Sequence, residues 1–421
     1  MHRSIRNAAR LVPLALVLLA PAARGGESDA LPPAVRNAKA QLLSQFFAQG
    51  GASPAVLEYR RKLQEYQAAR AAFDEEAGAY WSQISEKRKG RNAKRRSGQQ
   101  QITLDDYVLE HPPLYNGPKR PVNPEPEETP DRPTRKPIPV VADLLRSAQE
   151  LYQFTPQRPS SEVEFKRVYA RYALASGLTR EQAVRVYAFE TGGTGSYDVQ
   201  AGIEHGGKRA ISTAMGYNQL LTTNSVELLA EQGHEFIRAL SDKVARTSGP
   251  ARQSLEHKLT VLRKMVAHAK SVPDTWSEHE KIGNTAQGWA MHAMVLDIDI
   301  GPMLQTHKLL TSVLFARAKG YSRPLSAAEL EMMNLTGDGT GLDMVTMPQA
   351  MREQVPTANF FQRGGYERNP VAIRHNTVAK LLAITNSRMD ANSNLPGAKE
   401  LAAAFGSATA CLLYTSDAAD E

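Results

Sequence analysis

A glutamate lies where a helical pattern gives way to a glycine-rich loop, a position suited to acid catalysis. Residues 183–190 read Ala-Val-Arg-Val-Tyr-Ala-Phe-Glu, and Thr-Gly-Gly-Thr-Gly follows. A carboxylate at the C-terminal end of a helix faces the negative pole of the helix dipole, and the flanking Tyr187 and Phe189 would shield it from water. Both effects favour the neutral acid. Glu190 is therefore predicted to have a raised pKa and to donate a proton near neutral pH.

A second segment is predicted to form a tight turn rich in polar side chains. Residues 210–221 read Ala-Ile-Ser-Thr-Ala-Met-Gly-Tyr-Asn-Gln-Leu-Leu, which places Gln219 29 residues after Glu190. Together the two segments resemble the lytic transglycosylases, lysozyme-like enzymes that cleave the MurNAc-GlcNAc bond of peptidoglycan. The resemblance covers about 35 residues. It implies a lysozyme-like helical catalytic domain that acts on the glycan strands of the cell wall.

The resemblance also implies a role for individual residues. Glu190 would protonate the leaving oxygen and then take the proton of the sugar 6-hydroxyl, which gives 1,6-anhydromuramyl ends without water. The resemblance implies that the turn binds substrate. Ser212 or Thr213 would contact the N-acetyl group or sugar hydroxyls, and Gly216 would allow close backbone approach. Tyr217 would serve for packing or stacking, and Gln219 corresponds to the motif glutamine.

The sequence departs from the family pattern in three places. Thr191 replaces the usual serine after the glutamate, and the gap to the turn is lengthened by residues 195–208. The family's Ala-Tyr-Asn segment is not present verbatim. Its nearest counterpart begins at Asn334, and the family's late tyrosine corresponds to Tyr366, so we expect both in the substrate cleft.

Two other functions remain open at this stage. A lysozyme-like hydrolase would use water and a second carboxylate, for which the loop offers Asp198 or Glu204. A catalytically inactive wall-binding or scaffold protein would keep the fold alone. Trp276 is predicted to belong to the core or, alternatively, to a sugar-stacking platform at the cleft edge. We expect no metal or cofactor, because no ligand pattern for either occurs.

The two ends of the chain carry signals unrelated to the fold. Arginines, an apolar run and Ala-Pro-Ala within residues 1–22 are typical of a signal peptide, so we expect an exported, periplasmic or secreted protein. Residues 411–421 resemble a translated sequencing adapter. They include Cys411, the only cysteine of the chain. We therefore expect a protein that has no disulfide and no thiol nucleophile.

Between these ends the composition changes twice. Helix-forming residues over 33–86 predict a helical arm, and the basic run Lys87–Arg96 opens a proline-rich linker over 87–139. The net charge of +7 favours an anionic partner. The basic run is either a contact to an anionic envelope surface or a solvated charge run. It contains no aromatic residues, so nucleic acid is not an expected partner.

Residues 140–405 are predicted to form the catalytic domain, mostly from α-helices. Capping patterns recur before apolar runs at Ser161/Glu164, Thr179/Gln182, Asn224/Glu227 and Ser326/Glu329. Gly177 is placed where a helix would stop, and Asn369-Pro370 is placed where one leading to Ile384 would begin. Alternating strand patterns are nearly absent, and any small hairpin is expected within residues 192–208.

Overall fold

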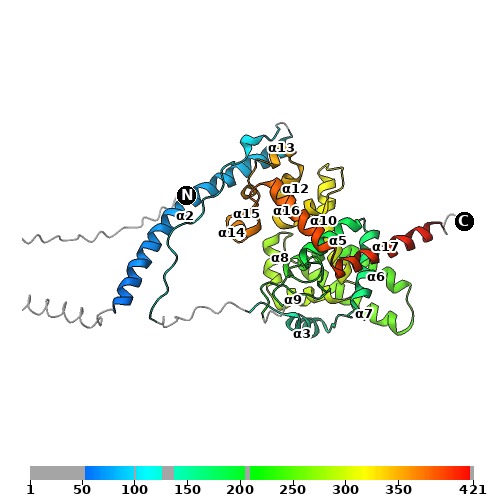
Figure 1. Ribbon diagram of the computed structural model, residues 1–421. Helices are drawn as coiled ribbons and strands as arrows, with labels where there is room; N and C mark the ends of the chain where they lie inside the picture. Colours follow the sequence, from blue (N-terminus) through cyan, green and yellow to red (C-terminus); the bar gives the residue numbers. More distant parts are fainter. Residues whose placement is uncertain (1–52, 99–100, 126–136, 204–208, 418–421) are drawn as a thin grey trace, which may run out of the picture. The chain divides into compact units, whose positions relative to one another are not determined.

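The computed structural model describes residues 53–98, 101–125, 137–203 and 209–417, with side chains up to residue 409 (Figure 1). These residues are mostly helical, and among them only isolated bridges occur in place of strands. The predicted mostly α class is therefore confirmed. In these ranges no helix is both long and apolar enough to cross a bilayer. The predicted signal peptide and the start of the predicted arm lie outside the described residues.

The chain divides into two compact units. In the described ranges the first unit holds residues 53–68 and 117–125, and the second holds residues 69–116 and 137–417. The first unit contains the beginning of α2, where Arg61 forms exposed ion pairs with Glu58 and Glu65. Such surface pairs contribute little to stability. The candidate site belongs to the second unit.

Most helices follow one another with short connections, but the segments between η1 and α3 and between α5 and α6 are long. In chain order they are α2 (Pro54–Ser97), η1 (Leu104–Asp106), α3 (Val141–Tyr152), α4 (Glu162–Ala175), α5 (Arg180–Glu190), α6 (Thr222–Ala245), α7 (Gly249–Ala269), α8 (Trp276–Gly283), α9 (Ala286–His292), η3 (Ala293–Leu296), α10 (Gly301–Ala318), α11 (Ala327–Thr336), α12 (Asp338–Thr346), α13 (Gln349–Arg352), η4 (Thr357–Phe360), α14 (Arg363–Glu367), α15 (Pro370–Arg374), α16 (Val378–Ser393) and α17 (Pro396–Asp417).

Local sequence explains where the helices around the site begin and end. The Thr179 hydroxyl accepts the Gln182 N–H at 3.1 Å, and the Gln182 side chain accepts the Thr179 N–H in return. Ser326 and Glu329 cap α11 in the same way. Gly177, after α4, adopts a φ of +92° that side chains disfavour. These predicted boundaries are confirmed.

Two predicted boundaries are wrong, and a third is confirmed without its full capping box. Asn224 lies in the first turn of α6, where its side chain accepts the N–H of Leu221, so α6 begins earlier than predicted. The helix predicted from Asn369 to Ile384 is interrupted between α15 and α16. Ser161 is the N-cap of α4 as predicted and accepts the Glu164 N–H, but the Glu164 side chain accepts from Ser160 in place of Ser161. At Leu221 and Ser160 a nearby side chain thus accepts a backbone N–H that the helix itself leaves free.

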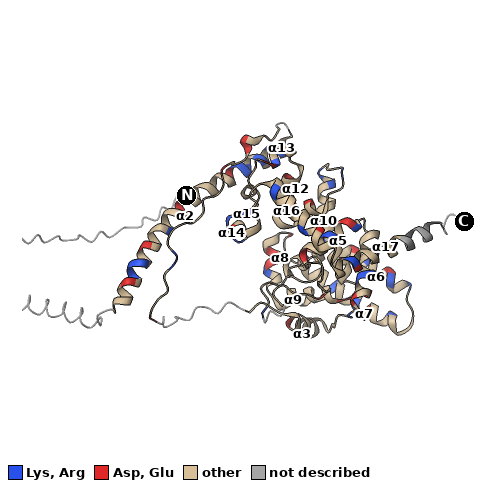
Figure 2. Ribbon diagram, viewed as in Figure 1, with Lys and Arg blue, Asp and Glu red and all other residues tan. Residues whose placement is uncertain are grey.

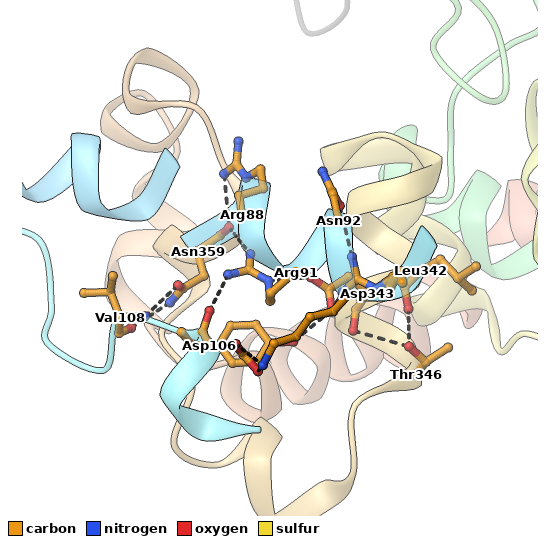
Figure 3. Close-up of polar contacts among 12 residues, drawn as sticks. Arg88, Arg91, Asn92, Asp106, Val108, Leu342, Asp343, Thr346 and Asn359 are labelled. Carbon is orange, nitrogen blue, oxygen red and sulfur yellow. Dashed lines mark hydrogen bonds and ion pairs between the residues drawn. The ribbon is translucent and has the colours of Figure 1, made fainter. Parts of the chain in front are cut away.

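The predicted boundary between arm and linker at residue 86 is wrong. Helix α2 continues to Ser97 and carries the basic run in its last turns (Figure 2). Lysine and arginine are good helix formers, and their positive charge suits a helix C-terminus. Arg91 is 0% exposed. Its Nε donates to Asp343 Oδ2 at 3.0 Å (Figure 3).

The segment after α2 also belongs to the helical domain. Asn359 exchanges two hydrogen bonds with the Val108 backbone, at 2.8 and 3.0 Å. Arg88 donates to the carbonyls of Asn359 and Phe361. Residues 69–116 therefore pack on the predicted catalytic domain, so that the domain extends beyond the predicted range of 140–405.

Two clusters of buried apolar side chains form the core of the second unit. One is built mainly from α4, α5, α11, α12, α16 and α17, and the other from α3, α6, α7, α9 and η3. Helix α10 contributes to both, with Leu309 and Val313 in the first cluster and Met303 and Leu304 in the second. The fold thus has two packed halves joined along α10.

Candidate active site

An open cavity of about 690 Å³ is lined by residues of both halves. Small-molecule sites commonly have about 300–1,000 Å³. Glu190 of α5 and Met333 of α11 come from the first half, and Leu228 of α6 comes from the second. Helix α10 crosses the cavity with Lys308 and Thr311. The cavity therefore lies where the two halves meet.

Glu190 is the last residue of α5 and lines this cavity. Asn334 Nδ2 donates a hydrogen bond to Glu190 Oε1 at 3.0 Å. Burial raises the pKa of Glu190 to about 7, against the smaller lowering effects of Lys308 and Asn334. A raised pKa of Glu190 is also what the sequence predicts. Tyr187 and Phe189, which the sequence suggested as its shield, are not among the cavity-lining residues.

Asn334, the nearest counterpart of the missing family segment, lies in the last turns of α11. Thr179 and Ser326 fix the starts of α5 and α11, and these two helices pack against each other. This packing brings the end of α5 to the end of α11. The structure thus places Asn334 against Glu190, although the two residues are 144 positions apart in sequence.

Gln219 lines the same cavity from the predicted turn. Its φ of +43° is unusual for a residue with a side chain, and its Nε2 donates to the Gly216 carbonyl at 2.9 Å. Met215 and Leu220 close the turn by two backbone hydrogen bonds of 2.9 and 3.0 Å. Backbone strain of this kind is common at functional sites.

A buried glutamine that the sequence analysis missed holds this turn in place. Gln305 Oε1 accepts the Asn218 N–H at 2.8 Å, and its Nε2 donates to the Met215 carbonyl. A Cβ atom on Gly216 would lie 2.0 Å from Gln305 Nε2. Gly216 therefore permits close approach of Gln305, in place of the predicted approach of substrate.

Three other predicted residues of the turn lie outside the cavity lining. Ser212 Oγ accepts the Ala214 N–H, and Thr213 Oγ1 accepts the Thr222 N–H. Tyr217 is fully buried in the first core cluster, with its hydroxyl bonded to Glu162. These side chains support the turn by contacts within the protein and do not line the cavity. The packing role predicted for Tyr217 agrees with this position.

The predicted placement of Tyr366 in the cleft is wrong. Its ring packs against Trp81 and Phe361, with centroids 5.6 and 6.0 Å away. It borders a separate cavity of about 230 Å³ that includes Phe73 and Tyr115. The reason is that α2 docks on this side of the domain and covers Tyr366.

Of the two carboxylates predicted for a hydrolase, the structure describes only Asp198, which is placed outside the cavity lining. Asp198 bonds to Arg158 and Ser196 and does not line the cavity, and Glu204 lies outside the described residues. Trp276, in contrast, is 46% exposed and lines the cavity from the start of α8. Of its two predicted settings, the structure places it at the cavity edge.

The cavity also holds charged residues that the sequence analysis missed. Glu227, Glu231 and Asp338 line it, and burial raises the pKa of each, to about 7 for Glu231. Lys308 faces them from α10, and burial lowers the pKa of this lysine. Behind Glu190, Glu331 of α11 is 3% exposed. An isolated charge within the apolar run Leu330–Met333 was the available signal.

Comparisons with known protein families, with curated proteins and with solved structures find no match to the chain. The fold and the site therefore define the protein only as a mostly helical one, with a cavity where a shielded carboxyl, an amide and a lysine meet. Its function has to be argued from that cavity.

Proposed function

We propose that the protein is an exported lytic transglycosylase that cleaves the MurNAc-GlcNAc bond of peptidoglycan with Glu190 as its single catalytic residue. The observation that carries the proposal is the position of Glu190: shielded, hydrogen-bonded to Asn334, and in the same cavity as Gln219. A glycan-cleaving acid has to be protonated at the working pH while it contacts the sugar. A pKa of about 7 meets that requirement.

The proposed reaction uses Glu190 twice. Glu190 donates its proton to the glycosidic oxygen as the bond from that oxygen to C1 of MurNAc breaks. The resulting carboxylate then accepts the proton of the MurNAc 6-hydroxyl as O6 forms a bond to C1. The proton returns to Glu190, the GlcNAc hydroxyl leaves, and the product is a 1,6-anhydromuramyl end. The Asn334 amide stabilises the carboxylate between the two steps, because hydrogen bonds to a charged acceptor are strong.

A second candidate function is favoured by one observation. Glu227, Glu231 and Asp338 line the same cavity, and any of them offers the second carboxylate that a water-using hydrolase needs. In that hypothesis these residues take the place of Asp198, and Glu204 stays a prediction. Such an enzyme would leave reducing ends on the glycan.

Digestion of purified peptidoglycan tests both functions. We expect the protein to release soluble fragments whose masses correspond to anhydro ends. Glu190→Gln keeps the shape of the side chain and should reduce the rate by about 10²–10⁴-fold. Asp198→Asn, outside the cavity, serves as the matched control with normal activity. Reducing ends would favour the hydrolase. Binding to the wall without release of fragments by the wild type would favour an inactive scaffold.

A further inference from the structure

Glu331 is a buried carboxyl on α11, the helix whose Asn334 contacts the half-buried Glu190. The side chain is 3% exposed, and its Oε2 has no hydrogen-bond partner among the described residues. Glu331 precedes Asn334 by three residues on α11, so both side chains lie on one face of that helix. The Asn334 amide that donates to Glu190 thus also lies near the Glu331 carboxyl.

Two neighbouring carboxyls shielded from water do not ionise independently. Burial and the charge of Glu190 raise the pKa of Glu331 well above its ordinary value, against the opposing effects of Asn334 and Lys308. The pKa of Glu190 itself is raised to about 7. Near neutral pH the pair therefore loses one of its two protons, and the remaining proton is bound to Glu331.

The other charged groups around the pair come from three helices. Lys308 of α10 interacts with both carboxyls, and Glu227 of α6 and Asp338 of α12 interact with Lys308 in turn. In the described part of the chain Lys308 forms no ion pair within 4.0 Å. Lys308 therefore opposes the rise in pKa of both carboxyls without forming an ion pair with either one.

We propose that Glu331 is a positioning residue that keeps a proton throughout the reaction and, through Asn334 and its own neutral carboxyl, stabilises the Glu190 carboxylate formed after proton donation. This inference deepens the proposed function and rests on it for its catalytic consequence. The carboxyl pair itself exists whether or not peptidoglycan is the substrate.

Carbon-13 NMR of glutamate carboxyls across a pH titration of the full chain tests the pair directly. In the wild type we expect two glutamate signals whose titration midpoints are more than about one pH unit apart. Each signal should be lost or shifted in the variants Glu190→Gln and Glu331→Gln, which assigns the pair. Glu331→Gln should remove the upper step and retain the lower one. Removal of the lower step, or a single common midpoint in the wild type, would overturn the proposal.

The catalytic consequence is tested by exchanging the Glu331 carboxyl for an apolar group. Glu331→Leu should raise the pKa of Glu190 by about one unit and reduce kcat about tenfold with KM unchanged, whereas Glu331→Gln, which retains a neutral polar group, should stay closer to the wild type. A fall of the Glu190 pKa in both variants would mean that Glu331 is ionised and repels it, and contradicts the proposal. If peptidoglycan is not cleaved at all, the NMR titration still decides on the pair, so the two proposals fail separately.

Discussion

Two carboxyl groups of the second unit, one buried and one half-buried, differ in the hydrogen-bond donors that surround them. Asp343 is 6% exposed and bonds to Arg91 at 3.0 Å, to Arg95 and to the Tyr107 hydroxyl (Figure 3). Glu190 has one amide donor, and among the described residues it forms no ion pair within 4.0 Å. The Asp343 carboxylate, with its two arginine partners, joins α2 to α12. A carboxyl without such a partner retains a proton that it can donate.

The comparison shows that burial alone does not make a carboxyl functional. Both sites are shielded, and both join segments far apart in sequence. What differs is the number and charge of the hydrogen-bond donors packed against each group, because an unpaired buried charge costs much more free energy than a buried neutral acid. We therefore expect the two sites to respond to substitution in opposite ways.

The largest effect should come from the structural site. Asp343→Ala leaves Arg91 buried without its partner and should lower the free energy of unfolding by about 3–5 kcal/mol. Thermal or denaturant unfolding measures this. Glu256→Ala breaks the exposed Arg252–Glu256 pair and should change the free energy by less than about 0.5 kcal/mol. Equal losses in the two variants would remove the distinction drawn above.

Asn334→Ala tests the one donor that Glu190 has. Loss of a hydrogen bond to a charged group should lower kcat by about 10–100-fold, corresponding to about 1.5–3 kcal/mol, with little change in KM. Leu335→Ala, at an exposed position of the same helix, is the matched control. A rise in KM at constant kcat would show that Asn334 binds substrate without acting on Glu190.

Glu190→Gln should stabilise the fold while it abolishes activity. Between the ordinary pKa of 4.5 and the folded-state value of about 7, the native state binds more protons than the unfolded state. Stability of the wild type therefore falls as pH rises through that window. Glu190→Gln has no carboxyl to ionise, so its stability does not fall in this window. It should be more stable than the wild type by about 1–3 kcal/mol at pH ~8 and no more stable at pH ~4. Unfolding curves at the two pH values decide, and a variant that is less stable at high pH contradicts the raised pKa.

The smallest effect is expected at the rim of the cavity. Trp276 is partly exposed there, so Trp276→Ala should weaken glycan binding by about 0.5–1.5 kcal/mol, seen as a rise in KM of roughly 2–13-fold at unchanged kcat. Steady-state kinetics on soluble glycan chains provides the measurement. An unchanged KM would limit the binding site to the inner part of the cavity.

Local signals in the sequence predicted the parts of the site that depend on neighbouring residues. The Thr179 and Ser326 caps, the turn before α6 and the end of α5 at Glu190 each follow from a few adjacent side chains. The mostly helical class follows from the same patterns. These features could be predicted because the backbone groups of caps and turns form hydrogen bonds with neighbouring residues in the sequence.

The remainder depends on packing between distant segments. Arg91 belongs to a run that reads as solvated charge, and only the folded chain shows that Asp343 meets it from 252 positions away. Tyr366 is covered by α2 for the same reason. Glu331 interrupts an apolar run, which marks it as unusual, but its interaction with Lys308 of α10 cannot be predicted from either segment alone.

The pH dependence of kcat/KM for peptidoglycan cleavage by the wild type tests the central claim most directly, because it reports the protonation state of the free enzyme. Our account predicts a rate that is level at low pH and falls about tenfold per pH unit above the Glu190 pKa of about 7. A profile that declines already near the ordinary glutamate pKa, or that rises across the neutral range, would contradict the assignment of Glu190 as the acid.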